Sequence, residues 1–244
     1  MKAVIFSGTT EGRTLSRAVA ALGADVTVCV ATDLGAEEQG CAPGITVRAG
    51  RLDAGEMTAL LQGAALCVDA THPYATEATR NIRAAATAAG VAYHRLLRPA
   101  SDLPAGSVVL ETAAQAAAYL AAKPGNVLLA TGAKELPAFA ALDPARLYPR
   151  VLPTLAGITA CEAAGIPHRN IIAMQGPFTL ELNVALLRQF AIAAMVTKDG
   201  GAAGGFAEKA EAVARCGVQL IVLRRPEEQG ENAETILQRC RELL

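Results

Sequence analysis

Short runs of apolar, mostly β-branched residues alternate along this chain with longer Ala-rich runs of helical character. Residues 2–7 (KAVIFS) and 65–70 (ALCVDA) are examples of the apolar runs. Strands that are apolar on both faces are typical of a parallel sheet with helices on each side. The sequence therefore predicts an α/β fold. In the first hundred residues we expect strands near 2–7, 25–31, 45–48, 65–70 and 92–96, and helices near 11–22, 54–62 and 75–89.

The alternation is interrupted at residues 98–106 (RPASDLPAG), which contain two prolines and a glycine and show no periodicity. Such a segment is typical of a linker. The pattern then resumes, so we expect two similar α/β domains, at residues 1–100 and 101–244. The second has predicted strands near 107–110, 126–131, 146–151, 170–174, 193–197 and 218–223, and predicted helices near 112–122, 134–141, 154–164, 179–189, 205–216 and 231–243.

The composition argues against several classes of protein. Apolar residues make up 52% of the 244 positions and charged residues 18%, which indicates a large core rather than a disordered chain. The net charge is -1 and no run of Lys or Arg occurs, which argues against a nucleic-acid partner. Six cysteines without a C-x-x-C pair predict reduced thiols, no metal site and a cytoplasmic location. Arg188 interrupts the most apolar later stretch, so we expect no membrane span.

The first strand-to-helix turn has the sequence FSGTTEGR. Its glycines would let the backbone approach a ligand, and the free N–H groups at the start of the helix favour a phosphate. The pattern G-x-x-x-G is shorter than the full dinucleotide fingerprint, and a plain capped turn is the alternative. The residues predicted to bind the cofactor here are Gly8, Thr9, Thr10, Gly12 and Arg13.

Asp33 follows the second predicted strand, 25 residues after Gly8. An acid at this place can accept hydrogen bonds from a ribose hydroxyl and would repel a 2′-phosphate. The alternative is that Asp33 caps a helix, because TDLGAEE also resembles a helix start.

The segment DATHPYA follows the strand at 65–70, where ligands bind in open parallel sheets. Its polar residues Asp69, Thr71, His72 and Tyr74 are too many for a buried loop without a ligand or a dense hydrogen-bond network. Pro73 fixes the turn. We interpret the segment as part of a binding site.

Four more polar segments follow strands in the second half. They are ATGAKEL (130–136), RVLP (150–153), MQGPF (174–178) and the glycine-rich TKDGGAAGGFAEK (197–209). Because strand ends of a parallel sheet share one edge, the four segments together predict a site.

One competing motif lies elsewhere. Tyr119 and Lys123 fit the Y-x-x-x-K pattern of short-chain dehydrogenases, with Ser107 upstream, although the glycine-rich turn of that family is absent. A dinucleotide-sensing protein without catalytic activity is the other alternative.

Taken together, the motifs resemble the precorrin-6A reductase family of cobalamin biosynthesis along the whole chain. The matching segments are GTTEGR (8–13), DATHPYA (69–75), TGAKEL (131–136), RVLP (150–153), MQGPF (174–178) with ELN (181–183), and VTKDGGAAGG (196–205) with EK (208–209). The resemblance implies two Rossmann-like domains with a cleft between them. It also implies hydride transfer from NADPH or NADH to a ring double bond of precorrin-6A or cobalt-precorrin-6A, giving the corresponding 6B form.

The resemblance extends the predicted site. Asp69, Thr71, His72 and Pro73 join the cofactor residues, with Asp33. Carboxylates on the ring call for spaced cations rather than a basic surface. The predicted substrate residues are Tyr74, Thr131, Gly132, Lys134, Glu135, Arg150, Gln175, Gly176, Lys198, Asp199, Gly201 and Lys209. Candidates for the catalytic group are His72, Tyr74 and Lys198. We expect a monomer, and Asp33 favours NADH and the cobalt-bearing ring.

Overall fold

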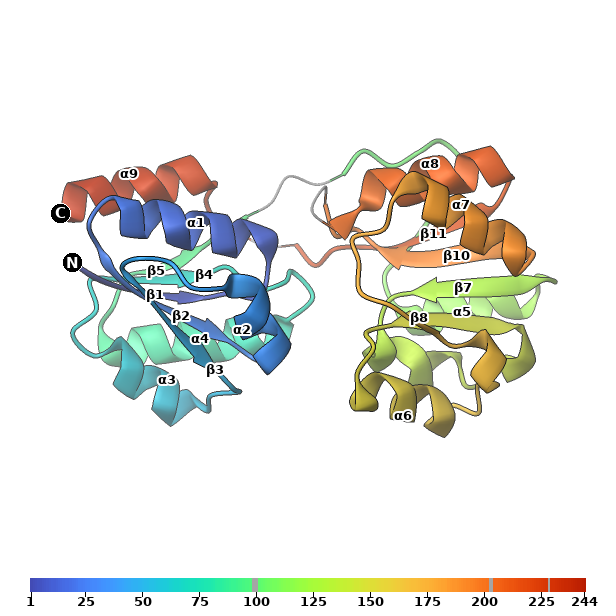
Figure 1. Ribbon diagram of the computed structural model, residues 1–244, viewed down its shortest axis with the longest axis horizontal. Helices are drawn as coiled ribbons and strands as arrows, with labels where there is room; N and C mark the ends of the chain where they lie inside the picture. The colour runs from blue at the N-terminus through green and yellow to red at the C-terminus, as the bar shows by residue number, and fades with distance from the viewer. Residues whose placement is uncertain (98–100, 202–203, 228) are drawn as a thin grey trace. The chain divides into compact units, whose positions relative to one another are not determined.

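The computed structural model describes residues 1–97, 101–201, 204–227 and 229–244. The chain forms two compact units. The first unit comprises Met1–Arg98 and Pro226–Leu244, and the second comprises Pro99–Arg225. Each is built on one all-parallel sheet with helices on both faces (Figure 1), which confirms the predicted fold class.

The first unit contains a five-stranded sheet in the order β3-β2-β1-β4-β5. Its central strands are almost completely buried because both faces are covered, which explains their continuous apolar sequences. The order reverses between β1 and β4, so the carboxyl ends of these strands form a switch point. The strands are β1 (Lys2–Phe6), β2 (Asp25–Val30), β3 (Ile45–Ala49), β4 (Leu66–Asp69) and β5 (Tyr93–Arg95).

Helices cover both faces of this sheet and enclose two cores. One core includes Leu15 and Val19 on α1 together with Ile236 and Cys240 on α9. The other includes Met57 on α3, and α4 adds Ile82 with its neighbours Ala85 and Ala86. The helices are α1 (Thr10–Ala21), α2 (Asp33–Gln39), α3 (Ala54–Leu61), α4 (Thr76–Ala89) and α9 (Ala233–Leu243).

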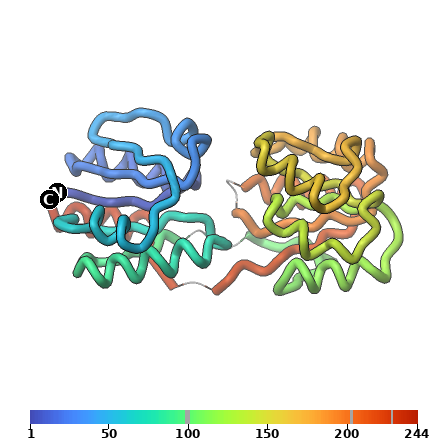
Figure 2. The backbone as a smooth tube through the Cα atoms, turned by 90° about the horizontal axis from the view of Figure 1, so that it is seen from below, coloured from blue at the N-terminus to red at the C-terminus, as the bar shows by residue number. Residues whose placement is uncertain are grey.

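The predicted boundaries of the second domain, 101–244, differ from the observed unit. After Arg225 the chain returns to the first unit, where Glu231 pairs with the end of β5: Leu97 N–H donates to Glu231 O at 2.8 Å. Helix α9 then packs on α1, and both chain ends lie together in the first unit (Figure 2). The amphipathic pattern of α9 shows that it covers a sheet, but not which of two similar sheets. The linker predicted at 98–106 falls partly outside the described residues.

The second unit contains a six-stranded sheet in the order β6-β11-β10-β7-β8-β9. The strands β7, β10 and β11 at its centre are the most apolar, as in the first unit. The strands are β6 (Val108–Leu110), β7 (Asn126–Ala130), β8 (Leu147–Val151), β9 (Ile172–Ala173), β10 (Ile192–Lys198) and β11 (Gln219–Leu223).

One predicted α-helix of the second unit has a different form. Residues 134–141 were expected to be α-helical, but Ala133–Phe139 form a 3₁₀ helix, η1. Pro137 inside the segment lacks an N–H group, so it cannot continue an α-helical ladder. The remaining helices are α5 (Ala113–Ala121), α6 (Leu155–Ala163), α7 (Leu180–Gln189), α8 (Phe206–Cys216) and the 3₁₀ turns η2 (Pro144–Arg146) and η3 (His168–Asn170).

Four of the six cysteines, Cys29, Cys67, Cys161 and Cys240, are buried as free thiols. In the parts of the chain that the structure describes, none of the helices combines the length and the apolar character needed to cross a bilayer.

Candidate functional site

The turn between β1 and α1 exposes the start of a twelve-residue helix. Gly8 has a φ of +129°, which a side chain would strain, and a Cβ placed there would meet no heavy atom within 4 Å. Thr9 caps the helix: its Oγ1 accepts from Gly12 N–H and donates to Ala70 O, each at 3.0 Å. Gly12 is needed for packing, since a Cβ there would lie 2.3 Å from Ser7 Oγ. The turn therefore offers open backbone at a helix N-terminus, as phosphate binding requires.

Arg13 lies in the first turn of α1, and its side chain is held by the neighbouring helix α2. Its Nη1 donates to Glu38 O in α2 at 2.7 Å. The hollow around Thr10 and Arg13 has a cavity volume of about 10 Å³, so the turn is a shallow surface.

Asp33 is the first residue of α2 and is exposed. Thr32, not Asp33, caps this helix, because Thr32 Oγ1 accepts from Gly35 N–H at 3.1 Å. The interpretation of Asp33 as a helix cap is therefore wrong. The predicted ribose contact stays a prediction.

The DATHPYA loop is fixed by a buried ionic network centred on Asp69. The Oδ1 atom of Asp69 accepts from Arg95 Nη1 at 2.7 Å, from Thr71 Oγ1 at 2.7 Å and from Thr71 N–H at 3.0 Å. Its Oδ2 accepts from Tyr93 Oη at 3.0 Å, and burial together with this negative charge raises the pKa of Tyr93. Both carboxylate oxygens thus have protein partners, so Asp69 positions the loop.

The rings of the loop lie at its surface. His72 is exposed and Tyr74 is half-buried, with ring centroids 5.5 Å apart. The Tyr74 N–H approaches His72 Nδ1 at 3.4 Å, and Pro73 between them is buried. The loop therefore presents two polar rings at the carboxyl edge of the first sheet.

In the second unit, two predicted substrate residues are buried cations. Arg150, at the end of β8, is 6% exposed, and Lys209 on α8 is 9% exposed. Arg150 Nη1 donates to Asn183 Oδ1 at 2.9 Å, and its guanidinium carbon lies 4.1 Å from the centroid of the Phe178 ring. Lys209 Nζ donates to Gly204 O at 2.7 Å. All of these contacts of Arg150 and Lys209 are with uncharged groups.

The electrostatics of this pair follow from its burial. Desolvation lowers the pKa of Arg150 to about 10 and that of Lys209 to about 8. The charge of Arg150 lowers the pKa of Lys209 further, and Glu208 and Asp199 oppose that effect. Burying cations of like sign is unfavourable unless an anion accompanies them. The arrangement is therefore suited to an acidic ligand group.

The loop after β10 is held by two acids. Lys198 Nζ lies 2.7 Å from Glu135 Oε1 of η1, and both side chains are partly exposed. Asp199 is buried and accepts from Ser101 Oγ at 2.7 Å and from Gly201 N–H at 3.1 Å. Asp199 therefore shapes the glycine-rich loop, while Lys198 remains accessible to solvent.

The other predicted substrate residues follow the same strand ends. Thr131 is buried after β7, and Lys134 is exposed on η1. Gly132 lies between them with a φ of +82°. Gln175 and Gly176 are exposed after β9. The second sheet thus brings all predicted substrate residues of this unit to its carboxyl edge, whereas Tyr74 belongs to the first unit.

A model of the family described as precorrin-6x reductase CbiJ/CobK matches residues 2–241. The chain belongs to this family. It is 36% identical over 230 residues to the cobalt-precorrin-6A reductase of Priestia megaterium, covering 91% of this chain and 90% of the relative. It is 34% identical over 237 residues to the cobalt-precorrin-6A reductase of Methanothermobacter thermautotrophicus, covering 93% and 77%. A solved structure described as CobK precorrin-6A reductase matches with a TM-score of 0.81 at 25% identity, covering 99% of this chain and 97% of that one.

Membership of the precorrin-6x reductase family confirms the resemblance drawn from the motifs. The chain is an oxidoreductase of cobalamin biosynthesis, of the NAD(P)H-dependent precorrin-6A reductase type. Both the metal-free and the cobalt-bearing substrate occur in the names of its relatives.

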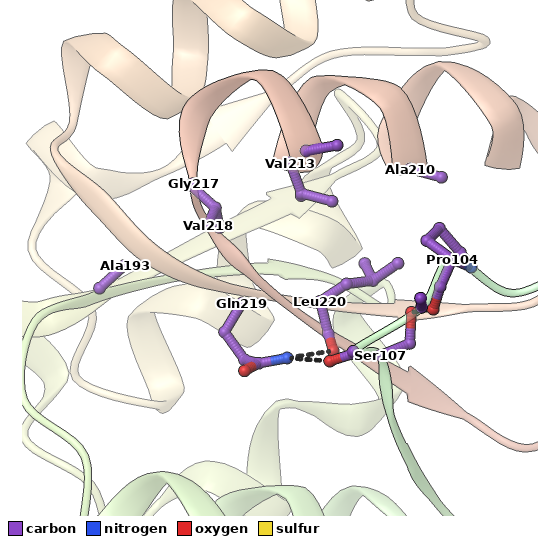
Figure 3. A pocket seen from close by; sticks show the side chains of 12 residues that line it. Pro104, Ser107, Ala193, Ala210, Val213, Gly217, Val218, Gln219 and Leu220 are labelled. Carbon is purple, nitrogen blue, oxygen red and sulfur yellow. Dashed lines mark hydrogen bonds between the residues drawn. The ribbon is translucent and has the colours of Figure 1, made fainter.

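The short-chain-dehydrogenase alternative does not fit this precorrin-6x reductase. Tyr119 and Lys123 lie at the end of α5 that leads into the start of β7, with Lys123 Nζ 5.4 Å from the Tyr119 ring centroid. They are therefore at the amino edge of the sheet, opposite the polar strand-end loops. The hollow in Figure 3 lies at this amino edge too, beside Gly217, Val218 and Gln219, so it is remote from those loops.

The structure adds several residues to the candidate site that the sequence did not indicate. Asn183 is fully buried and accepts a hydrogen bond from Arg150. The sequence indicated the ELN segment (181–183) but no role for Asn183. Leu152, Leu155 and Met174 are exposed by 48%, 84% and 40% after β8 and β9. An apolar residue that follows a buried strand looks in sequence like another buried residue. Its exposure is therefore visible only in the folded structure.

Proposed function

We propose that this reductase uses NADH, held by the first unit, to reduce cobalt-precorrin-6A, held by the second. The observation that carries the assignment of the second unit is the buried pair Arg150 and Lys209. Two desolvated cations at the end of a parallel sheet match the carboxylates that surround a tetrapyrrole. Hydride goes to one carbon of the ring double bond and a proton to the other.

The cofactor assignment rests on the β1–α1 turn. Open space at Gly8 and the capped start of α1 suit a pyrophosphate at the switch point between β1 and β4. When bound, NADH would supply the hydride. His72 and Tyr74 in the neighbouring loop, together with Lys198 of the second unit, remain our candidates for the catalytic group.

The preference for NADH rests on charge. Asp33 is exposed beyond β2, and residues 31–40 contain no Lys or Arg. Arg13, in the first turn of α1, is the basic residue that could receive a 2′-phosphate, but its Nη1 is bonded to Glu38 O. A 2′-phosphate near Asp33 would meet like charge.

The proposed binding of the ring also uses apolar surface. Leu152, Leu155 and Met174 are exposed in the segments that follow β8 and β9, and Leu155 is the first residue of α6. A flat ring can cover these side chains while its carboxylates reach Arg150 and Lys209. The cobalt form is favoured because the relatives above with 36% and 34% identity carry that name.

The deciding experiment compares both rings with both nucleotides. Purified enzyme is assayed anaerobically with precorrin-6A or cobalt-precorrin-6A and with NADH or NADPH, and product is followed by absorbance and mass. We expect the highest kcat/KM with NADH and the cobalt ring. A hundredfold preference for NADPH, about 2.7 kcal/mol at the transition state, would overturn the cofactor assignment. Binding of NADH without reduction of either ring would support the sensor alternative.

A further inference from the structure

A groove with a cavity volume of about 920 Å³ runs along α4 in the first unit. One wall is helical: Thr76, Thr79, Arg80, Arg83 and Thr87 recur at spacings of three and four residues, so they share one side of α4. Buried Ile82, Ala85 and Ala86 pack the other side into the core. Pro226, Glu227 and Gln229 of the returning segment also line the groove, as does Arg95.

The helical wall is cationic. Arg80 is exposed, and within the described ranges it forms no ion pair or hydrogen bond. Arg83 is also exposed and lies over the Tyr93 ring, 5.0 Å from its centroid. Glu227 is the single carboxylate among the described residues that line the groove. Threonine hydroxyls complete the wall, so it is suited to anionic groups rather than to an apolar ligand.

The groove is continuous with the DATHPYA loop. Arg95 Nη1 donates to Thr71 Oγ1 at 3.1 Å, and this hydroxyl lies 3.4 Å from Thr79 Oγ1 in the wall of the groove. From Thr76 to Thr87 the helix rises about 16 Å, at roughly 1.5 Å per residue. A ligand that enters at the loop can therefore extend beside Arg80 and Arg83.

We propose that this groove binds peripheral carboxylates of the tetrapyrrole, with Arg80 and Arg83 as the recognising cations. The proposal rests on the function proposed above and adds a substrate subsite in the first unit. A dinucleotide at the β1–β4 switch point would direct its adenosine towards β2 and Asp33, whereas the groove lies along α4, on the side of β4 and β5. Arginine forks bind carboxylates in a bidentate manner, which fixes the orientation of a ring that bears several acids.

The test uses the full-length enzyme with Arg80→Gln, Arg83→Gln and the double variant. Arg51→Gln is the matched control, because Arg51 is exposed just after β3, at the opposite edge of the same sheet. We expect the KM for cobalt-precorrin-6A to rise three- to fivefold in each single variant and at least tenfold in the double variant. The kcat, the KM for NADH and all constants of Arg51→Gln should stay within twofold of wild type. Added KCl should raise the ring KM of wild type more than that of the double variant.

An unchanged ring KM in the double variant would overturn the proposal, and so would a parallel rise in the KM for NADH. Binding of cobalt-precorrin-6A without nucleotide, followed by fluorescence quenching, gives a second readout. If wild-type enzyme reduces neither ring, the proposed function fails, while the same binding comparison still tests the groove. A loss of affinity confined to the Arg80 and Arg83 variants would support it, and equal affinity in all variants would refute it.

Discussion

Arg95 Nη1 lies 2.7 Å from Asp69 Oδ1, and the two side chains are 2% and 0% exposed. This buried ion pair joins the end of β4 to the end of β5. It also fixes Thr71, which bonds to the same carboxylate oxygen. Two polar residues of the DATHPYA loop, Asp69 and Thr71, thus hold the loop in place. His72 and Tyr74 can therefore lie at its surface even when no ligand is bound.

Asp69→Asn should destabilise the protein by about 3–5 kcal/mol, because it removes the buried carboxylate that pairs with the buried Arg95. Urea unfolding followed by circular dichroism measures the change. Glu211→Gln is the control: it removes the exposed pair with Arg215 on α8 and should cost about 1 kcal/mol or less. Equal, small effects of both substitutions would contradict the supporting role of Asp69.

Gly8→Val should weaken NADH binding at least tenfold, because the new side chain occupies the open space over the turn. Isothermal titration of the folded variant gives the affinity. Gly63→Val is the matched control. Gly63 also has a positive φ, +70°, and a Cβ placed there would meet no heavy atom within 4 Å, but it lies in the turn before β4. Both should lose about 1–2 kcal/mol of stability. Unchanged affinity in Gly8→Val would exclude phosphate binding at this turn.

The KM for the ring should rise with pH as Lys209 loses its proton. Burial lowers the pKa of this group to about 8, so a bound carboxylate loses its charged partner above that pH. We expect up to about a tenfold rise per pH unit above pH 8. Lys209→Gln should have a high KM that no longer depends on pH in this range, and the KM for NADH should stay flat in both enzymes.

The lowered pKa of Lys209 affects folding stability in the opposite direction from ring binding. The unfolded chain binds the Lys209 proton more tightly than the folded protein, so stability should increase between about pH 8 and the ordinary pKa of 10.5. The measurement is the unfolding free energy of wild type and of Lys209→Gln as a function of pH. If the two proteins show the same pH dependence in this range, the Lys209 amine is not buried as described.

Lys198→Ala should weaken ring binding by about 2–3 kcal/mol and leave NADH affinity nearly intact. The loss has two parts, because Glu135 would then face the acidic ring without its partner at 2.7 Å. The double variant with Glu135→Gln should therefore bind the ring better than Lys198→Ala alone. If ring and NADH affinity fall together, the roles assigned to the two units are wrong.

Asp33→Arg should shift the preference from NADH towards NADPH by at least tenfold in the ratio of kcat/KM. The structure removes the capping explanation, because Thr32 caps α2. Glu37→Arg, an exposed change on the same helix, is the control and should have little effect. An unaltered ratio in Asp33→Arg would mean that the ribose lies elsewhere.

The alternation of apolar and helical runs determined the fold class and the order of nearly all elements. This was possible because a strand buried on both faces must be apolar throughout, and that requirement is local to each segment. Polar residues directly after such strands also identified the strand-end loops, since parallel strands place these ends on one edge. The 3₁₀ form of η1 could have been read from Pro137, whose missing N–H is likewise a local property.

Tertiary structure alone decided which surfaces meet. Helix α9 has an apolar face that fits either sheet by pattern, and its packing on α1 places the end of the chain in the first unit. The burial of Arg150 and Lys209, the exposure of Leu155 and the Asp69–Arg95 pair likewise depend on residues distant in sequence. Sequence patterns report how each segment divides its polar and apolar sides, whereas charge compensation and solvent exposure arise only when those sides are brought together.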